Sequence, residues 1–222
     1  MSKTYGKTRW KRFALVMVPS IAATAAVGFS IANSALAASF SISGQEFKVH
    51  TTHLQGEGFS QFGTVDVEAG GKLHPVAVSA FDKADITNLC QSVVTDLSGF
   101  GLGKITLQLN AGGEGSTPVH AEKLLIDLED LKADATFQDI NIGEDASALT
   151  GPAVGSWHPH PVVGKATGDK LPTGAMGFAQ AARTATLDNV QQTARATSAG
   201  TFVLSGLHLS LKQGDGAGNE CF

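Results

Sequence analysis

The chain has 222 residues, with 16 Lys and Arg against 20 Asp and Glu, a length that suits one domain and a targeting segment. Residues 1–37 hold five of the cations and no acid, so the remainder carries 11 cations against 20 acids, a net charge of −9. An acidic body of this kind is repelled by phosphate backbones, which argues against nucleic acid as a partner.

The N-terminal segment, residues 1–37, has the layout of a secretory signal. A cationic start is followed by the uncharged stretch Phe13–Ala32 and then by the small-residue processing pattern Ala35-Leu36-Ala37. About 20 apolar residues can also span a bilayer, so an uncleaved signal-anchor, a transmembrane helix, is the alternative. Pro19 favours cleavage because it makes a poor permanent anchor. Both interpretations place residues 38–222 outside the cell or on the outer face of the cytoplasmic membrane.

The body, residues 38–222, has the alternation of β-strands. Strand-like patterns occur at Ser39–Val49, His74–Phe81, Lys104–Asn110 and Thr201–Leu211. The glycine-punctuated segment Gly56–Gly63 is expected to be a loop or hairpin. We therefore predict an all-β single domain: a sandwich, a half-open barrel or a short solenoid.

The clearest alternation lies in the central stretch Ala121–Gly143. Its apolar residues change phase near Glu129-Asp130 and again near Gln138-Asp139, which predicts strands joined by a bulge and a tight turn. A rival interpretation makes Glu122–Lys132 an amphipathic helix. We expect the carboxylates here, Asp127, Asp134 and Asp139 with Asn141, to occupy outward and turn positions.

A six-residue phrase within this stretch, Ala135–Ile140, has echoes at Ala84–Leu89 and Ala185–Val190. One interpretation of the echoes is a repeat array of coils or blades in which each copy occupies an equivalent position. We favour the simpler interpretation that the phrase is a common strand-to-turn composition, since Asn and Asp tolerate left-handed φ.

Residues 143–177 form the irregular part of the domain, rich in Gly and Pro. This loop contains the weak site candidates Trp157, His158 and His160, which with His50 and His53 could supply a surface metal site. We expect solvated loop histidines and a hydrophobic plug at Trp157 instead, and we predict no metal and no cofactor.

The two cysteines, Cys90 and Cys221, are expected to form one disulfide in an exported domain. No G-x-S-x-G, S-x-x-K, zinc-protease or nucleotide-binding motif occurs. The sequence therefore offers no catalytic residue to name.

Several specific sequence blocks stand out along the chain. They are RWKRF (Arg9–Phe13), the run Pro19–Ala23, SALAASF (Ser34–Phe40), HPVAVSA (His74–Ala80), TNLCQSVV (Thr87–Val94), ADATFQDINIG (Ala133–Gly143) and NECF (Asn219–Phe222). In these blocks the chain resembles a family of exported, signal-bearing actinomycete proteins of unknown function. Automatic naming often labels its members "cholesterol esterase", and they tend to be encoded beside a small multi-pass membrane protein. The resemblance implies export and that membrane partner, and it supplies no catalytic residues.

We thus expect a non-enzymatic protein of the cell envelope that acts by binding or assembly. The alternative is a lipid-handling protein, either a lipid or sterol ester hydrolase as the label says or a carrier of an apolar ligand.

Overall fold

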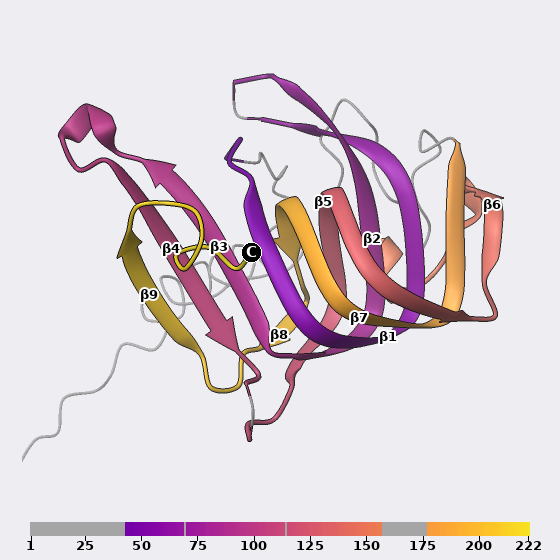
Figure 1. Cartoon of the computed structure of the whole chain (residues 1–222). Coiled ribbons are helices and arrows are strands. Elements are labelled where there is room, and N and C mark those ends of the chain that lie inside the picture. The colour runs from indigo at the N-terminus through magenta and orange to yellow at the C-terminus, as the bar shows by residue number, and fades with distance from the viewer. Residues whose placement is uncertain (1–42, 69, 114, 157–176) are drawn as a thin grey trace, which may run out of the picture. The chain divides into compact units, whose positions relative to one another are not determined.

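The computed structural model describes residues 43–68, 70–113, 115–156 and 177–222, all within the second of the chain's two units, residues 40–222. This unit is an antiparallel sheet with short helical turns (Figure 1), so the prediction of a mostly β single domain is confirmed. The strands are β1 (Phe47–Val67), β2 (Leu73–Thr87), β3 (Leu89–Asp96), β4 (Lys104–Ala111), β5 (Val119–Gln138), β6 (Asn141–Asp145), β7 (Phe178–Ser198), β8 (Thr201–Val203) and β9 (His208–Gln213). The helical turns are η1 (Ser98–Phe100), η2 (Ala146–Ala148) and α2 (Pro152–Ser156).

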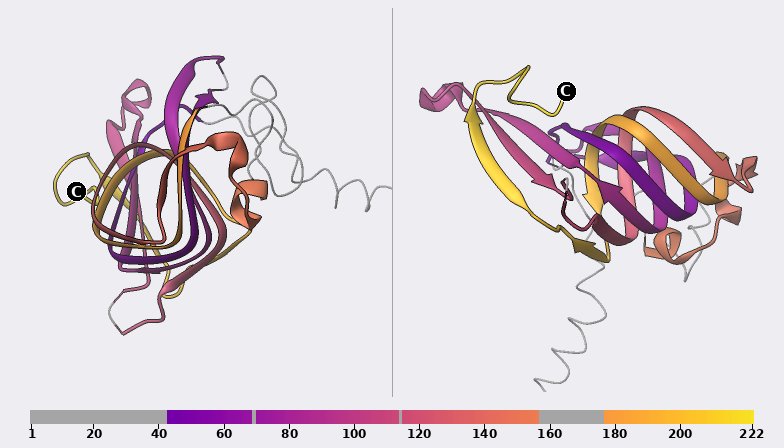
Figure 2. Two further views of the ribbon diagram at one scale, coloured as in Figure 1. Left: turned by 90° about the vertical axis from the view of Figure 1, so that its right-hand side faces the viewer. Right: turned by 60° about the horizontal axis from the view of Figure 1, so that its bottom comes forward.

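Strands β1, β2, β5 and β7 form a partial ring, called the ring below. The order β7-β5-β2-β1 is joined at its ends by a further pairing between β7 and β1. The pairing can be followed around the ring along one row of residues. Ala121 of β5 pairs with Ala84 of β2, Ala84 with Gly56 of β1, Gly56 with Ala185 of β7, and Ala185 with Phe137 of β5. The row thus begins and ends on β5, at positions 16 residues apart (137−121). The strands therefore wind steeply around the interior, as the end-on and tilted views show (Figure 2).

Single left-handed residues let each wound strand keep its apolar side chains inside. Within the described ranges, the non-glycine residues with positive φ are Asn88, Lys123, Asp139 and Asn189, with φ between 52 and 55°. Around Asn189 the buried interior residues change from Ala185 and Leu187 to Val190, a switch from odd to even positions. An uninterrupted strand would turn Val190 outward, because side chains alternate with a period of two.

The repeated phrase encodes these kinks. Its fifth residue is Asn88, Asp139 or Asn189, and each is left-handed. Copies one and three also lie at matching positions on the two sides of β1, because Ala84 and Ala185 both face Gly56. The second copy is offset, since Ala135 faces Leu187.

Two details of the sequence interpretation change. Gly56–Gly63 is not a loop; it lies inside β1, where a Cβ on Gly56 would come within 2.3 Å of Phe81 Cδ1. Gly56 thus leaves room for the Phe81 ring inside the core. The helical alternative for Glu122–Lys132 is also wrong, because that segment is part of β5, with register shifts between Asp127 and Asp130.

Strands β3, β4 and β9 extend the sheet beyond the ring as a wing with two different faces (Figure 1). Apolar residues occupy the odd positions: Val93 pairs with Leu107, and Leu107 with Leu211. Most even positions are polar, and two of these residues, Ser92 and Thr106, are buried. The wing is therefore amphipathic with the strand period of two.

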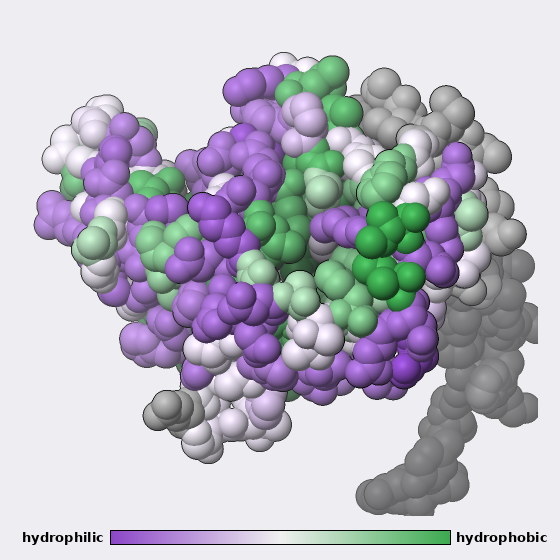
Figure 3. All heavy atoms as spheres, turned by 45° about the vertical axis from the view of Figure 1, so that its right-hand side comes forward, coloured by the Kyte–Doolittle hydropathy of each residue, from purple (hydrophilic) through white to green (hydrophobic). Residues whose placement is uncertain are grey.

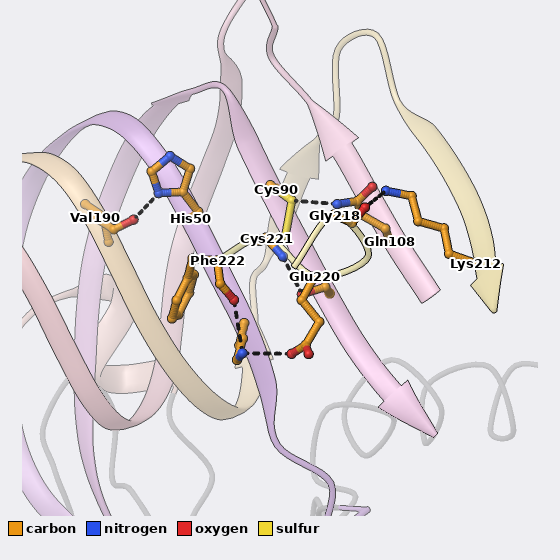
Figure 4. Close-up of a disulfide and its surroundings, with 11 residues drawn as sticks. His50, Cys90, Gln108, Val190, Lys212, Gly218, Glu220, Cys221 and Phe222 are labelled. Carbon is orange, nitrogen blue, oxygen red and sulfur yellow. Dashed lines mark hydrogen bonds and ion pairs between the residues drawn. A yellow bond between two sulfur atoms is a disulfide. The ribbon is translucent and has the colours of Figure 1, made fainter. Parts of the chain in front are cut away.

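The C-terminal tail, residues 214–222, covers the polar face of the wing. A disulfide joins Cys221 to Cys90 of β3, with 2.02 Å between the sulfurs (Figure 4). The Cys221 N–H donates to Ser92 Oγ at 3.1 Å, and Thr106 Oγ1 donates to the Gly214 carbonyl at 2.6 Å. Lys48 Nζ of β1 forms an ion pair with Glu220 at 2.9 Å, so the tail is bound on this face at several points.

On the outer surface of the ring, η2 and α2 pack over β2 and β5. Leu149 and Val154 are buried there against Phe62 and Val78. The Ala153 N–H of α2 donates to Asp82 Oδ1 at 2.8 Å. No helix of the described ranges is long and apolar enough to cross a membrane, and Phe13–Ala32 lies outside them.

We predict that Asn189→Val destabilises the protein by about 1–2 kcal/mol more than Asn189→Gly, because a left-handed conformation is costly for a residue with a Cβ. Both variants lose the hydrogen bond from Asn189 Nδ2 to Asp134 Oδ2 at 2.9 Å, so their difference isolates the backbone term. Equilibrium unfolding in denaturant measures it. Equal midpoints would contradict the role given to the kink.

We also predict that Cys90→Ala with Cys221→Ala lowers the free energy of unfolding by as much as about 5 kcal/mol on the chain-entropy estimate. The physical reason is the long loop, since the sequence separation of the two cysteines is 131. Denaturant unfolding of the double variant and of reduced wild type should agree. An unchanged midpoint in both would show that the tail is held by its other contacts.

Candidate functional site

The ring encloses an apolar cavity of about 230 Å³, called the main lobe. A space-filling view shows apolar side chains gathered in a hollow with hydrophilic side chains around its rim (Figure 3). The ring of Phe59 packs against those of Phe81 and Phe137, with centroid-to-centroid distances of 5.3 Å and 5.1 Å. The lining residues are Leu54, Phe59, Gln61, Ser79, Phe81, Ile126, Leu128, Leu131, Ala133, Ala135, Phe137, Gln180, Leu187 and Gln192.

The main lobe borders the surface along the second half of β5. Residues 119–128 pair with β2, but the same edge of residues 129–138 has no strand partner among the described residues. Leu131 is 37% exposed although it lines the lobe, and Ala135 is exposed as well. This unpaired edge therefore forms the mouth of the cavity.

Three neutral polar side chains are hydrogen-bonded in series within the lining. Gln180 Nε2 donates to Gln61 Oε1 at 2.5 Å, and Gln61 Nε2 donates to Ser79 Oγ at 2.8 Å. Among the described lining residues no side chain carries a formal charge. The lobe thus suits an uncharged, mostly apolar occupant.

A small lobe of about 30 Å³ continues the interior toward the wing. It shares Leu54, Ile126 and Gln192 with the main lobe, and Val49 and Gln91 also line it. The row of paired residues that contains Gln192 then runs through Val49, Gln91 and Leu109 to Leu209 of β9.

The apolar face of the wing is continuous with this interior. Leu109 packs against the ring's core, while Leu209 is 58% and Leu211 73% exposed. The disulfide holds the tail on the opposite face, so the tail leaves this apolar face uncovered. A mostly apolar tract, interrupted by the amides of Gln192 and Gln91, therefore runs from the mouth at β5 to β9, the last strand of the sheet among the described residues.

The lining offers no general base for nucleophilic chemistry. Ser79 is the hydroxyl in the main lobe, and its hydrogen-bond donor there is an amide, Gln61. A serine nucleophile needs a neighbouring base to take its proton. The described lining of the main lobe places no such base beside Ser79.

Of the histidines considered from sequence, His50 and His53 lie in the described part of the chain, and each contacts a different partner. His50 Nδ1 lies 2.8 Å from the Val190 carbonyl oxygen, and His53 Nδ1 lies 2.7 Å from Asp188 Oδ1. Trp157, His158 and His160 lie outside the described residues. Within the described part of the chain, no group of three or more His, Cys, Asp or Glu side chains is arranged to hold a metal ion.

A second cluster, on the outer side of the sheet, contains the hydrogen-bonded carboxyl pair Asp66 and Asp127. Burial, followed by the adjacent charge of Asp66, raises the pKa of Asp127 to about 8. The protonated Asp127 carboxyl donates to Asp66, whose own pKa burial also raises. Asp127 therefore faces outward, as expected from sequence, but it is half-buried there and shielded from solvent.

Charged groups of several elements surround the carboxyl pair. Arg195, 9% exposed, binds Glu129 of β5 and, at 2.7 Å, Glu46 before β1. His74 Nε2 lies 3.1 Å from Glu68 Oε2. Asp66 Oδ2 is buried without a hydrogen-bond partner among the described residues. The cluster joins the first residues of the described unit to β2, β5 and β7.

Sequence reasoning identified a strand face that lines the cavity, but not the cavity itself. The alternation of Leu131, Ala133, Ala135 and Phe137 marks one face of a strand, and that face lines the main lobe. Gln61, Gln180 and Gln192 were missed because a glutamine in a strand is ordinarily solvated, and nothing local distinguishes a buried one.

Comparison with known proteins places the chain in one family. The model described as "Family of unknown function (DUF6230)" matches residues 43–222. The chain belongs to the DUF6230 family. The match covers the ring, the wing and the tail, together with both lobes of the cavity. No curated protein and no solved structure matches the chain.

We predict that Asp127→Asn makes stability less dependent on pH. The raised pKa means that folded Asp127 keeps its proton where the unfolded side chain, with a pKa near 3.9, has lost it. The stability that Asp127 contributes should therefore be fully present below about pH 4 and fall toward pH 8, with a limiting slope of about 1.4 kcal/mol per pH unit. Asn cannot ionise, so this part of the decline should disappear.

Denaturant midpoints at about pH 5 and pH 8 test this expectation. Asp130→Asn is the matched control, because Asp130 lies on the same strand with a side chain 62% exposed. A decline in Asp127→Asn as steep as in wild type would refute the assignment of the buried proton.

Proposed function

We propose that this protein is a non-enzymatic binding protein of the cell envelope that holds an aliphatic chain in the main lobe. The observation that carries the proposal is an open, uncharged, apolar cavity inside the ring. Its volume of about 230 Å³ exceeds the roughly 150 Å³ of a dry protein cavity that binds benzene. Burial of each methylene group contributes about 0.8 kcal/mol, so even a short chain gains affinity there.

The unpaired edge of β5, residues 129–138, favours a binding role over a purely structural one. Side chains at Leu131, Ala133 and Ala135 face the lobe yet remain partly exposed. A core built only for stability would cover these groups, because exposed apolar surface forgoes the free energy of burial. An occupant that lies along β5 would cover them.

Export follows in this proposal from the signal-like residues 1–37 and from the disulfide, a bond that persists in oxidising compartments. The actinomycete resemblance adds a small multi-pass membrane protein as the proposed partner. A membrane protein and a carrier of apolar chains have compatible chemistry, since the membrane is the source and sink of such chains.

We predict that Ala135→Phe abolishes binding of the apolar dye aminoanthracene by filling the main lobe at its exposed mouth. Thr136→Phe is the matched control, because position 136 adds the same side chain to the other face of the same strand. Fluorescence titration of purified residues 38–222 measures the affinity. Retained affinity in Ala135→Phe, or equal loss in both variants, would count against the cavity as the site.

The hydrolase alternative is tested on the same material. Incubation with p-nitrophenyl octanoate should give no turnover above the Ser79→Ala variant, because Ser79 lacks a neighbouring base in the described lining. Turnover that disappears in Ser79→Ala would replace the binding proposal with an esterase.

A further inference from the structure

Gln192 brings a neutral amide to the cavity. The residue is 7% exposed and lines both lobes. The side chains of Gln61 and Gln180, by contrast, bond to one another. Among the described residues the buried polar side-chain atom without a partner is Asp66 Oδ2, not an atom of Gln192, so the Gln192 amide borders the cavity and can bond to what the cavity holds.

The position of Gln192 puts this amide at the junction of the lobes. Backbone pairing flanks it with Val49 of β1 and Leu131 of β5, both apolar. On the far side of Val49, Gln91 brings a second amide to the small lobe. A chain that extends from the mouth into the interior would therefore pass apolar walls and then meet neutral amides.

The chemistry at this junction selects among polar groups. A carboxamide both donates and accepts hydrogen bonds, so it pairs with a hydroxyl, an ester or an amide. An ionised headgroup would need a counter-charge to offset its desolvation, and the described residues that line the two lobes include no Lys, Arg, His, Asp or Glu.

We propose that Gln192 is the specificity-determining residue of the cavity and that the ligand is an aliphatic chain bearing an uncharged hydrogen-bonding group. The amide of Gln192 binds that group while the main lobe holds the hydrocarbon. This inference rests on the proposed function, because it assigns the ligand class of the same cavity.

The test compares octane, octanol and octanoate as displacers of aminoanthracene. Wild type should bind octanol about tenfold more tightly than octane, a factor that corresponds to roughly 1.4 kcal/mol, and should bind octanoate less tightly than octanol. Gln192→Met keeps the side-chain volume and removes the amide. It should bind octane as wild type does and lose the preference for octanol.

Gln191→Met is the matched control. Gln191 is the neighbouring residue of β7 and does not line either lobe, so the preference for octanol should persist there. A preference that survives in Gln192→Met, or a wild type that favours octanoate over octanol, would overturn the assignment of Gln192. Failure of octane and octanol alike to displace the dye would instead overturn the proposed function itself.

Discussion

The whole ring depends on strands that bend sharply without turning their apolar side chains outward. A regular strand alternates its faces, and a one-residue change of phase exposes what was buried. Left-handed residues at Asn88, Lys123, Asp139 and Asn189 absorb that change. Before each kink the inward-facing residues have odd numbers and after it even numbers, or the reverse. The apolar side chains therefore stay inside, and long strands can wind around a single core.

Because of this winding, the strands close one part of the interior and leave another part open. Where β2, β1 and β7 lie side by side, the core is closed and holds fully buried residues such as Ala84 and Ala185. Where β5 comes round to pair with β7 alone, its other edge has no described partner and the core opens as the cavity. The cavity is thus a product of how the sheet closes, not an addition to it.

The disulfide determines which face of the wing the C-terminal tail covers. It fixes the tail to the polar face of the wing, together with the hydrogen bonds to Ser92 and from Thr106. The apolar face, with Leu209 and Leu211 at its edge, is left continuous with the small lobe. Covalent pinning therefore contributes to stability and also decides which face of the wing stays uncovered.

The sequence by itself determined the β class, the phase changes in β5, the pairing of the two cysteines and the turn chemistry of the repeated phrase, because alternation and left-handed tolerance are local properties. Only the tertiary structure decided that Gly56–Gly63 is a strand, that Asp127 shares a proton with Asp66, and that Gln192 faces a cavity. Burial of these groups comes from neighbours distant in the chain: Asp66 lies on β1, and Gln192 meets Val49 and Leu131 from two other strands. No local pattern records which strands will become neighbours, so the polar groups that define the candidate site were invisible until the ring was built.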